Sequence, residues 1–145
     1  MDFFSALDTS ASGLSAQRIR MNVISSNLAN IHTTRTPEGG PYQRKDVVFA
    51  AGGQASDFNS MLRDRMADPS TPVEVVGVVN DTKEPLLKYD PQHPDADDSG
   101  YVALPNINLM EEMVNLLSAT RSYEANVSAI KASKSMIQKA LEIGK

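Results

Sequence analysis

The chain has no cysteine and no tryptophan, and aromatic residues make up only 6% of its 145 residues. Without cysteine, the sequence excludes thiol catalysis, cysteine-ligated metal sites and disulfides. Scarce aromatic residues also leave little material for a large core, because aromatic side chains bury the most surface. The length suits one domain, or a small domain with long helical extensions. We therefore expect a chain that is short of buried surface as a monomer.

Positive charge is also scarce, since 14 Lys and Arg face 18 Asp and Glu, which gives a net charge of -4 and a pI near 5.1. Nucleic-acid binding needs a stripe of positive charge, so nucleic acid is excluded as the main partner. No apolar run approaches the ~20 residues of a membrane-spanning helix. The first residues lack the basic and apolar regions of a secretory signal. We expect no direct membrane insertion, and either a cytosolic protein or export by a route that reads no such signal.

What the chain does have is a row of apolar residues three and four positions apart near its C-terminus. This spacing places the residues on one side of a helix, so it predicts a long helix with a narrow seam that needs a partner. Such a helix would run roughly 50 Å, longer than a compact domain of this size needs, which favours assembly over chemistry. The row comprises Leu109, Met113, Leu116, Thr120, Tyr123, Val127, Ile130, Lys134, Ile137 and Leu141.

The N-terminal region carries a second seam, in which one apolar residue recurs every seven positions: Leu7, Leu14, Met21 and Leu28. This repeat predicts a helix over residues 3–31. Gly13 and the surrounding serines weaken it, because both residue types are poor helix formers. We expect the two terminal helices to pair with each other. An ordinary two-helix core closed over a small sheet would give the same periodicity and remains open.

Between the helices the pattern changes to short β-branched and aromatic runs, which are typical of strands. We predict strands over 45–49, 73–79, 86–89 and 101–104, and a short helix over 58–66. Asn108 followed by Glu111 resembles a capping box, in which the Asn side chain accepts a hydrogen bond from an exposed backbone N–H.

These elements together predict an α+β fold, with long N- and C-terminal helices that pair as a coiled coil around a small β-rich insertion. We expect the paired terminal helices, residues 1–31 and 106–145, to form an assembly domain. The loop and β-rich insertion between them spans residues 32–105.

The segment from Asp90 to Gly100 concentrates carboxylates and one histidine. Asp95, Asp97, Ser99 and Gly100 match the first ligand positions of a calcium-binding EF-hand loop. However, position 12 of such a loop is Asn106, where a bidentate Glu is required. A solvated acidic turn between two strands fits the segment better. A soluble metal-binding domain centred on this segment stays open as an alternative function.

His93 lies beside Asp90 and Asp95, as a general base lies beside an orienting carboxylate. Acid–base catalysis also needs a nucleophile and an oxyanion stabiliser, and the sequence offers a candidate for neither. We therefore expect no enzyme activity, no catalytic or metal-binding residue, and no cofactor.

Two segments resemble the signature of the bacterial flagellar axial proteins, the family of rod, hook and hook-associated proteins. In that family an N-terminal helix ends in Ser-Asn-Leu-Ala-Asn-x-x-Thr, and residues 26–33 here read SNLANIHT. Residues 112–126, EMVNLLSATRSYEAN, are similar to the second half of the signature. Residues 33–45, 75–79, 89–91, 93–97 and 100–106 are similar to the proximal rod members of the family.

The resemblance implies a structural subunit of the flagellar proximal rod, which polymerises into the helical drive shaft that transmits torque from motor to hook. It places the protein in the periplasmic rod of the basal body, with the paired terminal helices lining the inner tube and the insertion outside. Implied partners are other copies of the chain, neighbouring rod proteins and the MS-ring/rod junction protein. The flagellar type III apparatus would export the chain without a cleavable signal peptide.

The candidate assembly interface combines the two helical seams with the polar residues of the resembling segments. Asparagine on a packed seam can fix the register between helices, because its amide bonds across the interface. The residues expected in the interface are Leu7, Leu14, Met21, Asn27, Leu28, Asn30, Leu109, Met113, Leu116, Leu117, Tyr123, Asn126, Val127, Ile130, Ile137 and Leu141.

Overall fold

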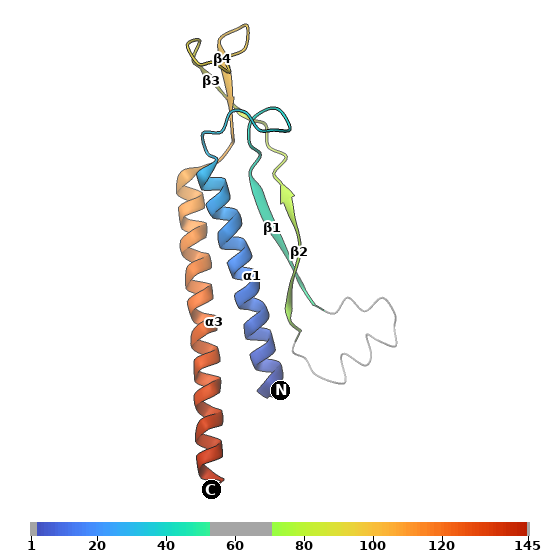
Figure 1. Ribbon diagram of the computed structural model, residues 1–145, viewed down its shortest axis with the longest axis vertical. Helices are drawn as coiled ribbons and strands as arrows, with labels where there is room; N and C mark the ends of the chain where they lie inside the picture. Colours follow the sequence, from blue (N-terminus) through green and yellow to red (C-terminus); the bar gives the residue numbers. More distant parts are fainter. Residues whose placement is uncertain (1–2, 53–70, 145) are drawn as a thin grey trace, which may run out of the picture.

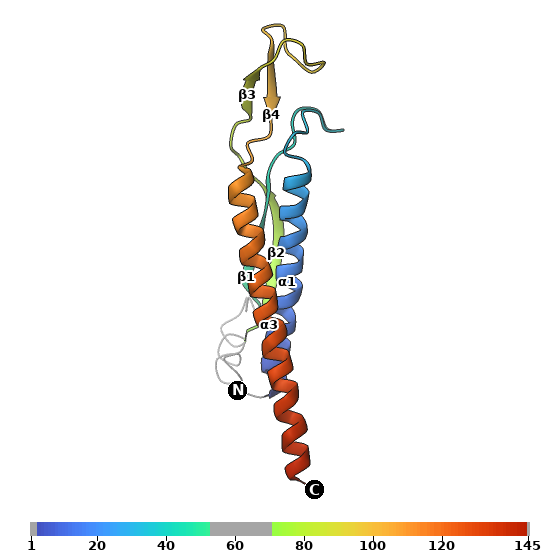
Figure 2. The same cartoon turned by 90° about the vertical axis from the view of Figure 1, so that its left-hand side faces the viewer.

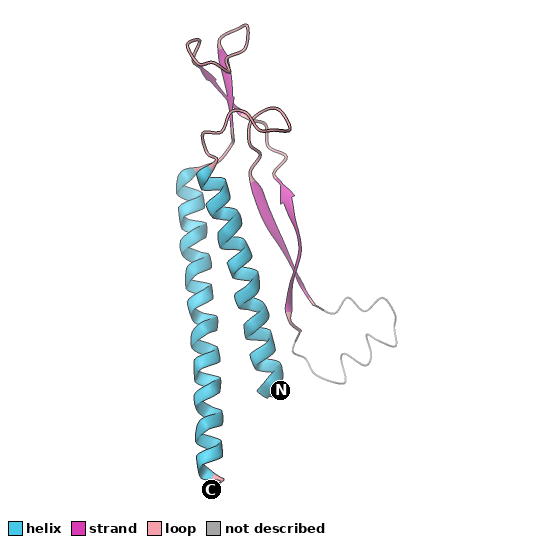
Figure 3. Ribbon diagram, in the orientation of Figure 1, coloured by secondary structure: helices cyan, strands magenta, loops and turns pink. Residues whose placement is uncertain are grey.

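The computed structural model describes residues 3–52 and 71–144 as an elongated α+β molecule (Figure 1). Two long helices run side by side and the strands form two separate hairpins, as Figure 3 shows. The predicted α+β class is confirmed, and the short helix expected over 58–66 lies outside the described residues. The elements are α1 (Phe3–Ala29), β1 (Lys45–Ala51), β2 (Val73–Asn80), β3 (Leu86–Tyr89), β4 (Tyr101–Leu104) and α3 (Leu109–Ile143).

Helices α1 and α3 pack along each other in opposite directions (Figures 1 and 2). Gly13 is a point of close contact, because a Cβ atom there would lie 2.9 Å from Asn126 Nδ2. The missing side chain leaves room for the Asn126 side chain at this level. A residue that weakens α1 as an isolated helix therefore serves its packing against α3.

The core is thin, and its buried apolar residues are small or few: Ala16, Ile24, Val102, Ile107 and Ala119. On α3, Glu112 and Ala119 are buried. Leu116 and Tyr123, on the same side of the helix, are half-buried. Leu109 and Met113 of the predicted row are exposed. The side of α3 that faces α1 is thus rotated from the predicted row, and it includes the small, fully buried residue Ala119.

Strands β1 and β2 form an antiparallel ribbon that packs on the side of α1 away from α3 (Figure 1). The pairing register shifts between Val48 and Phe49, where β2 contains one extra residue. A bond from the Val73 backbone N–H to Ser12 Oγ, 3.0 Å long, ties the far end of the ribbon to α1. The molecule therefore has three layers: α3, α1 and the ribbon.

Strands β3 and β4 form a second antiparallel hairpin, which projects beyond the ends of the helices (Figure 2). Tyr89 and Tyr101 are paired in the register, and their rings meet edge to face with centroids 5.3 Å apart. Gly100 has a φ of +81°, a backbone conformation that favours glycine. The acidic segment between the two strands is thus a closed hairpin loop at the tip of the molecule.

Helix α3 begins as the sequence predicts, since Asn108 Oδ1 accepts a hydrogen bond of 3.0 Å from the Met110 backbone N–H. Its other end extends well past the start of α1 (Figures 1 and 2). Gly13 faces Asn126, and α1 is described from ten residues before Gly13, so α3 extends beyond the described α1 from about residue 136 onward. We call residues 138–144 the overhang. Neither described helix is apolar over enough of its length to cross a membrane.

Candidate assembly interface

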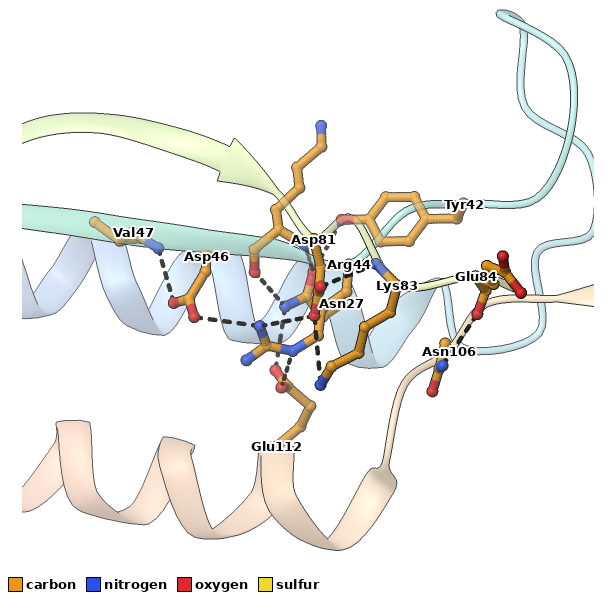
Figure 4. A network of polar contacts seen from close by, with 11 residues as sticks. Asn27, Tyr42, Arg44, Asp46, Val47, Asp81, Lys83, Glu84, Asn106 and Glu112 are labelled. Atoms are coloured by element: carbon orange, nitrogen blue, oxygen red, sulfur yellow. Dashed lines mark hydrogen bonds and ion pairs between the residues drawn. The ribbon is translucent and has the colours of Figure 1, made fainter. Parts of the chain in front are cut away.

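A cluster of polar side chains joins α1, β1 and α3 where the helices meet the insertion (Figure 4). Asn27 is fully buried and makes four hydrogen bonds. Its Nδ2 donates to the Lys45 carbonyl oxygen (2.8 Å) and to Glu112 Oε2 (3.1 Å). Its Oδ1 accepts from the Lys45 backbone N–H (2.9 Å) and from the Tyr42 hydroxyl (3.1 Å). The whole amide is therefore satisfied inside the subunit, as a buried polar group requires.

Arg44 compensates the buried charge of Glu112, whose side chain is only 1% exposed. Its Nε donates to Glu112 Oε1 at 2.9 Å, and a second nitrogen donates to Asp46 Oδ2 at 3.2 Å. Burial alone would lower the pKa of the Arg44 guanidinium, but its bonds to Glu112 and Asp46 outweigh this effect and raise the pKa. The guanidinium therefore stays charged. We call Asn27, Tyr42, Arg44, Asp46 and Glu112 the polar junction.

The polar junction fixes how the insertion leaves the helix pair. The Asn27 side chain bonds to the backbone N–H and carbonyl of Lys45, the first residue of β1. Glu112 on α3 accepts a bond from the same Asn27 side chain. Hydrogen bonds have strong directional preferences, so this set selects one arrangement of three elements. Both polar atoms of the Asn27 amide and both carboxylate oxygens of Glu112 bond to groups of the subunit. This buried part of the junction therefore acts as a structural connection, and a small cavity of about 110 Å³ lies beside it, lined in part by Tyr42 and Arg44.

Two shallow hollows lie along the helix pair, and we call them together the groove. The upper hollow, of about 490 Å³, lies on the first half of α3. The lower hollow, of about 190 Å³, is formed by Tyr123 of α3 against α1. Thr120 links the groove to the helix contact, because its Oγ1 lies 3.7 Å from Met21 Sδ. The upper hollow is lined by Met110, Met113, Val114, Leu116, Leu117 and Thr120, and the lower by Ala11, Leu14, Ser15, Arg18 and Tyr123.

The apolar side chains that line the upper hollow are exposed to solvent. Leu117 is 53% exposed, and Met110, Met113 and Val114 are exposed at least as much. No charged residue lines this hollow. A contiguous apolar surface on a protein with so little core is typical of a site where another protein packs.

The side chains of His93, Asp95 and Asp97 in the acidic loop accept hydrogen bonds from other groups of the subunit. Asp97 Oδ1 accepts from the backbone N–H groups of Ser99 (2.9 Å) and Tyr101 (2.8 Å), and Asp95 Oδ2 accepts from the Thr34 hydroxyl at 2.7 Å. His93 Nδ1 accepts from the Asp95 N–H at 3.1 Å. Within residues 3–52 and 71–144, no three acidic or histidine side chains are grouped so as to hold a metal ion. The geometry therefore does not favour the metal-binding alternative.

Known proteins match the chain over its full length. The family model "Flagella basal body rod protein" covers residues 7–35, and "Flagellar basal body rod FlgEFG protein C-terminal" covers residues 98–143. The flagellar basal-body rod protein FlgC of Bacillus subtilis is 47% identical, over the whole of both chains. The FlgC proteins of Borreliella burgdorferi (46%) and Salmonella typhimurium (40%) each align with 99% of this chain, and with 98% and 99% of their own lengths.

The chain belongs to the FlgC family of flagellar basal-body rod proteins. It is a structural subunit of the basal-body rod and assembles there with other rod proteins. The two family models fall on α1 and on the β4–α3 region, which contain the groove and two members of the polar junction, Asn27 and Glu112.

The structure places the residues of the predicted assembly interface in three settings. Asn27 is buried within the subunit, where its bonds are all used. The half-buried members lie on or beside the helix contact: Leu7, Leu14, Met21, Leu28, Asn30, Leu116, Tyr123, Asn126, Val127, Ile130 and Ile137. The exposed members are Leu109, Met113, Leu117 and Leu141. Six members, Leu14, Met21, Met113, Leu116, Leu117 and Tyr123, line the groove or contact a residue that does.

Sequence reasoning missed the polar junction apart from Asn27. From the sequence, Glu112 is an acidic residue near the start of the C-terminal helix, and Tyr42 and Arg44 belong to a segment that resembles proximal rod members; none of the three is predicted to meet Asn27. A signal for Glu112 existed, because it lies four residues before Leu116 and seven before Ala119, on one side of α3. No local pattern could have found Arg44, since its partner is 68 residues away.

Proposed function

We propose that this chain forms the proximal segment of the rod and polymerises helically into the drive shaft that transmits torque from motor to hook. The proposal rests on the FlgC relatives together with one observation of the structure. That observation is the apolar groove along the helix pair, which the subunit leaves uncovered. Unlike surfaces that meet head to tail generate an open helical array, which suits a shaft.

The groove and its neighbouring seam residues are the proposed assembly surface. In this proposal the terminal helices, residues 1–31 and 106–145, line the inner tube, and residues 32–105 pack outside. The three layers of the subunit support such a division, because among the described elements the ribbon contacts α1 and only α1 contacts α3. Burial of the exposed apolar residues would add stability at each repeated contact, at about 25 cal/mol per Å².

Two more specific partners are proposed from the same family membership. We propose that the chain contacts the MS-ring/rod junction protein at one end of its segment. We further propose that the flagellar type III apparatus exports it to the periplasmic rod. The chain performs no catalysis in this account, since the buried polar groups of the junction bond to one another.

The proposed function can be tested with one charge placed in the groove. Leu117→Asp puts a carboxylate in the upper hollow, whereas Ser118→Asp puts the same charge on an exposed neighbouring position outside it. Leu117 is exposed in the subunit, so the folded chain tolerates the charge. Burial against a neighbour would cost several kcal/mol per contact. Cells that carry only Leu117→Asp should export the subunit and build no rod, as judged by electron microscopy of basal bodies.

The control variant separates the effect of position from the effect of added charge. Ser118→Asp should build normal rods, because its side chain lies outside the upper hollow. Normal rods from Leu117→Asp, or equal damage from both variants, would contradict the proposed assembly surface. Normal rods in cells that lack the chain altogether would contradict the proposed function itself.

A further inference from the structure

The chain has no cysteine, so its only side-chain sulfur atoms belong to seven methionines. Four of them lie in the part of the chain that the structure describes, and they differ in exposure. Met110 is 69% exposed, Met113 is 53% exposed and Met136 is 62% exposed. Met21 is half-buried, and its sulfur lies 3.7 Å from the Thr120 hydroxyl. Three thioether groups are therefore open to an oxidant that reaches the folded subunit.

Two of these three methionines line the upper hollow together. Met110 and Met113 are three positions apart on α3, so their side chains lie on one side of the helix. Among the residues that line the hollow, Thr120 has the only polar side chain. Its hydroxyl already donates to the Leu116 carbonyl oxygen at 2.8 Å. The lining therefore offers no spare side-chain donor to a polar group at position 110 or 113, and Met136 lies outside it.

We propose that Met110 and Met113 are oxidation sites of the unassembled subunit, and that their sulfoxides keep it out of the rod; this inference rests on the proposed function. The oxidant is a small peroxide, of which hydrogen peroxide is the simplest. A sulfur lone pair attacks one peroxide oxygen, so an S–O bond forms while the O–O bond breaks. Sulfur loses two electrons, and the departing hydroxide takes the proton of the transferred oxygen and leaves as water.

The sulfoxides change the surface of the subunit and leave its fold intact. In the free subunit both side chains face water, which hydrates the new oxygen atoms. A neighbour that packs on the hollow displaces this water, and the lining has no donor to replace it. A polar group buried without a partner weakens such a contact by about tenfold or more. A methionine sulfoxide reductase returns the thioether, so the block is reversible.

Treatment of the purified chain with hydrogen peroxide tests the two sites. Mass spectrometry of its peptides follows the sulfoxide at each methionine over time. Met110 and Met113 should be oxidised at least about fivefold faster than Met21, because only the first two are exposed. The difference should vanish in urea. Equal rates in the folded chain, or a difference that persists in urea, would overturn the assignment of the sites.

The effect on assembly is tested in cells that carry Met110→Leu together with Met113→Leu, because leucine cannot form a sulfoxide. Cells receive sublethal hydrogen peroxide while they build rods. Completed rods are counted by electron microscopy of basal bodies, relative to untreated cells of the same strain. The wild-type count should fall at least about threefold further than the count of the double variant. Met136→Leu is the matched control and should fall as the wild type does.

A second measurement needs no oxidant. Met110→Gln together with Met113→Gln places polar groups of similar length in the hollow, and should lower the rod count of untreated cells by about tenfold or more. Met136→Gln adds the same amide outside the hollow and should keep the count within about twofold of wild type. Normal rods from the double Gln variant, or equal losses from both, would overturn the inference.

The outcomes also separate this inference from the proposed function. An equal fall in peroxide-treated wild type and double Leu cells would mean that oxidative damage elsewhere stops assembly. Protection by Met136→Leu would place the sensitive sulfur outside the hollow. Either result would overturn the inference and leave the proposed function intact, which fails only if untreated cells that lack the chain build normal rods.

Discussion

The two ends of the helix pair are built differently. At the end that adjoins the insertion, polar groups from α1, β1 and α3 bond to one another, and Asn27 and Glu112 are buried. At the other end, the overhang leaves Leu141 and Ile143 exposed. Directional bonds fix the shape of one subunit, and the apolar surface, which has no preferred direction, is the surface on which we propose that neighbours pack.

This difference predicts two separable kinds of damage. Changes in the polar junction should unfold the subunit, because they leave buried groups without partners. Changes in the groove should leave the subunit folded and stop assembly. Substitutions in the polar junction test the expected loss of stability, and the largest loss is expected at Arg44.

Arg44→Met should destabilise the subunit most, by about 3–5 kcal/mol, because it leaves the Glu112 carboxylate buried without its cationic partner. The free energy of unfolding, measured by urea denaturation of the purified subunit, gives the cost. Arg44→Lys keeps the charge and should cost less than half as much. Lys83→Met removes an exposed charge and serves as the surface control, with an expected change below about 0.5 kcal/mol.

The contribution of Arg44 should not depend on pH near neutrality. Its pKa is raised in the folded subunit, so the stabilisation is fully present below the unfolded pKa and is lost only as pH rises through the folded value. Both values lie far above neutrality. The difference between wild type and Arg44→Met should therefore stay constant from about pH 6 to about pH 9.

Asn27→Ala should cost about 2–3 kcal/mol, since it removes four hydrogen bonds and leaves both backbone groups of Lys45 without their side-chain partner. Asn30→Ala is the matched control. Its Nδ2 donates to the Ser26 carbonyl oxygen in an exposed setting, and its Oδ1 accepts from the Thr33 hydroxyl at 3.1 Å, so loss of its two bonds should cost about 1 kcal/mol, less than the loss of four buried ones. Equal costs for the two asparagines would contradict the special role of the junction.

Local signals in the sequence were enough for most of the fold. Asn108 marks the start of α3, and strands predicted over 86–89 and 101–104 have the observed bounds. These elements were predictable because their capping residue and their flanking turn residues lie next to them in the sequence.

The rotation of α3 against α1 was not predictable in the same way. The predicted row and the row that faces α1 share Leu116, Tyr123 and Ile130, so apolar spacing could not separate them. The residues that mark the buried side are Ala119 and Glu112, one small and one charged, and the buried charge of Glu112 is compensated by Arg44, which is far away in the sequence.

The smallest effect is expected in the acidic loop. Replacement of His93, Asp95 and Asp97 by Gln, Asn and Asn should leave swimming speed nearly unchanged. An Asn at position 97 keeps an oxygen that can accept the Ser99 and Tyr101 N–H bonds. Swimming assays of the triple variant check this expectation. Complete loss of motility with normal export would revive a metal-binding role for the loop.

Hydrogen exchange of the free subunit, followed amide by amide along α3, tests the contrast between the two ends most directly. The account predicts strong protection near the polar junction, around residues 112–120, and a steady fall to little protection in the overhang. In the assembled rod, protection should extend over the overhang as well. Equal protection along all of α3 in the free subunit, or an overhang that stays unprotected in the rod, would contradict the account.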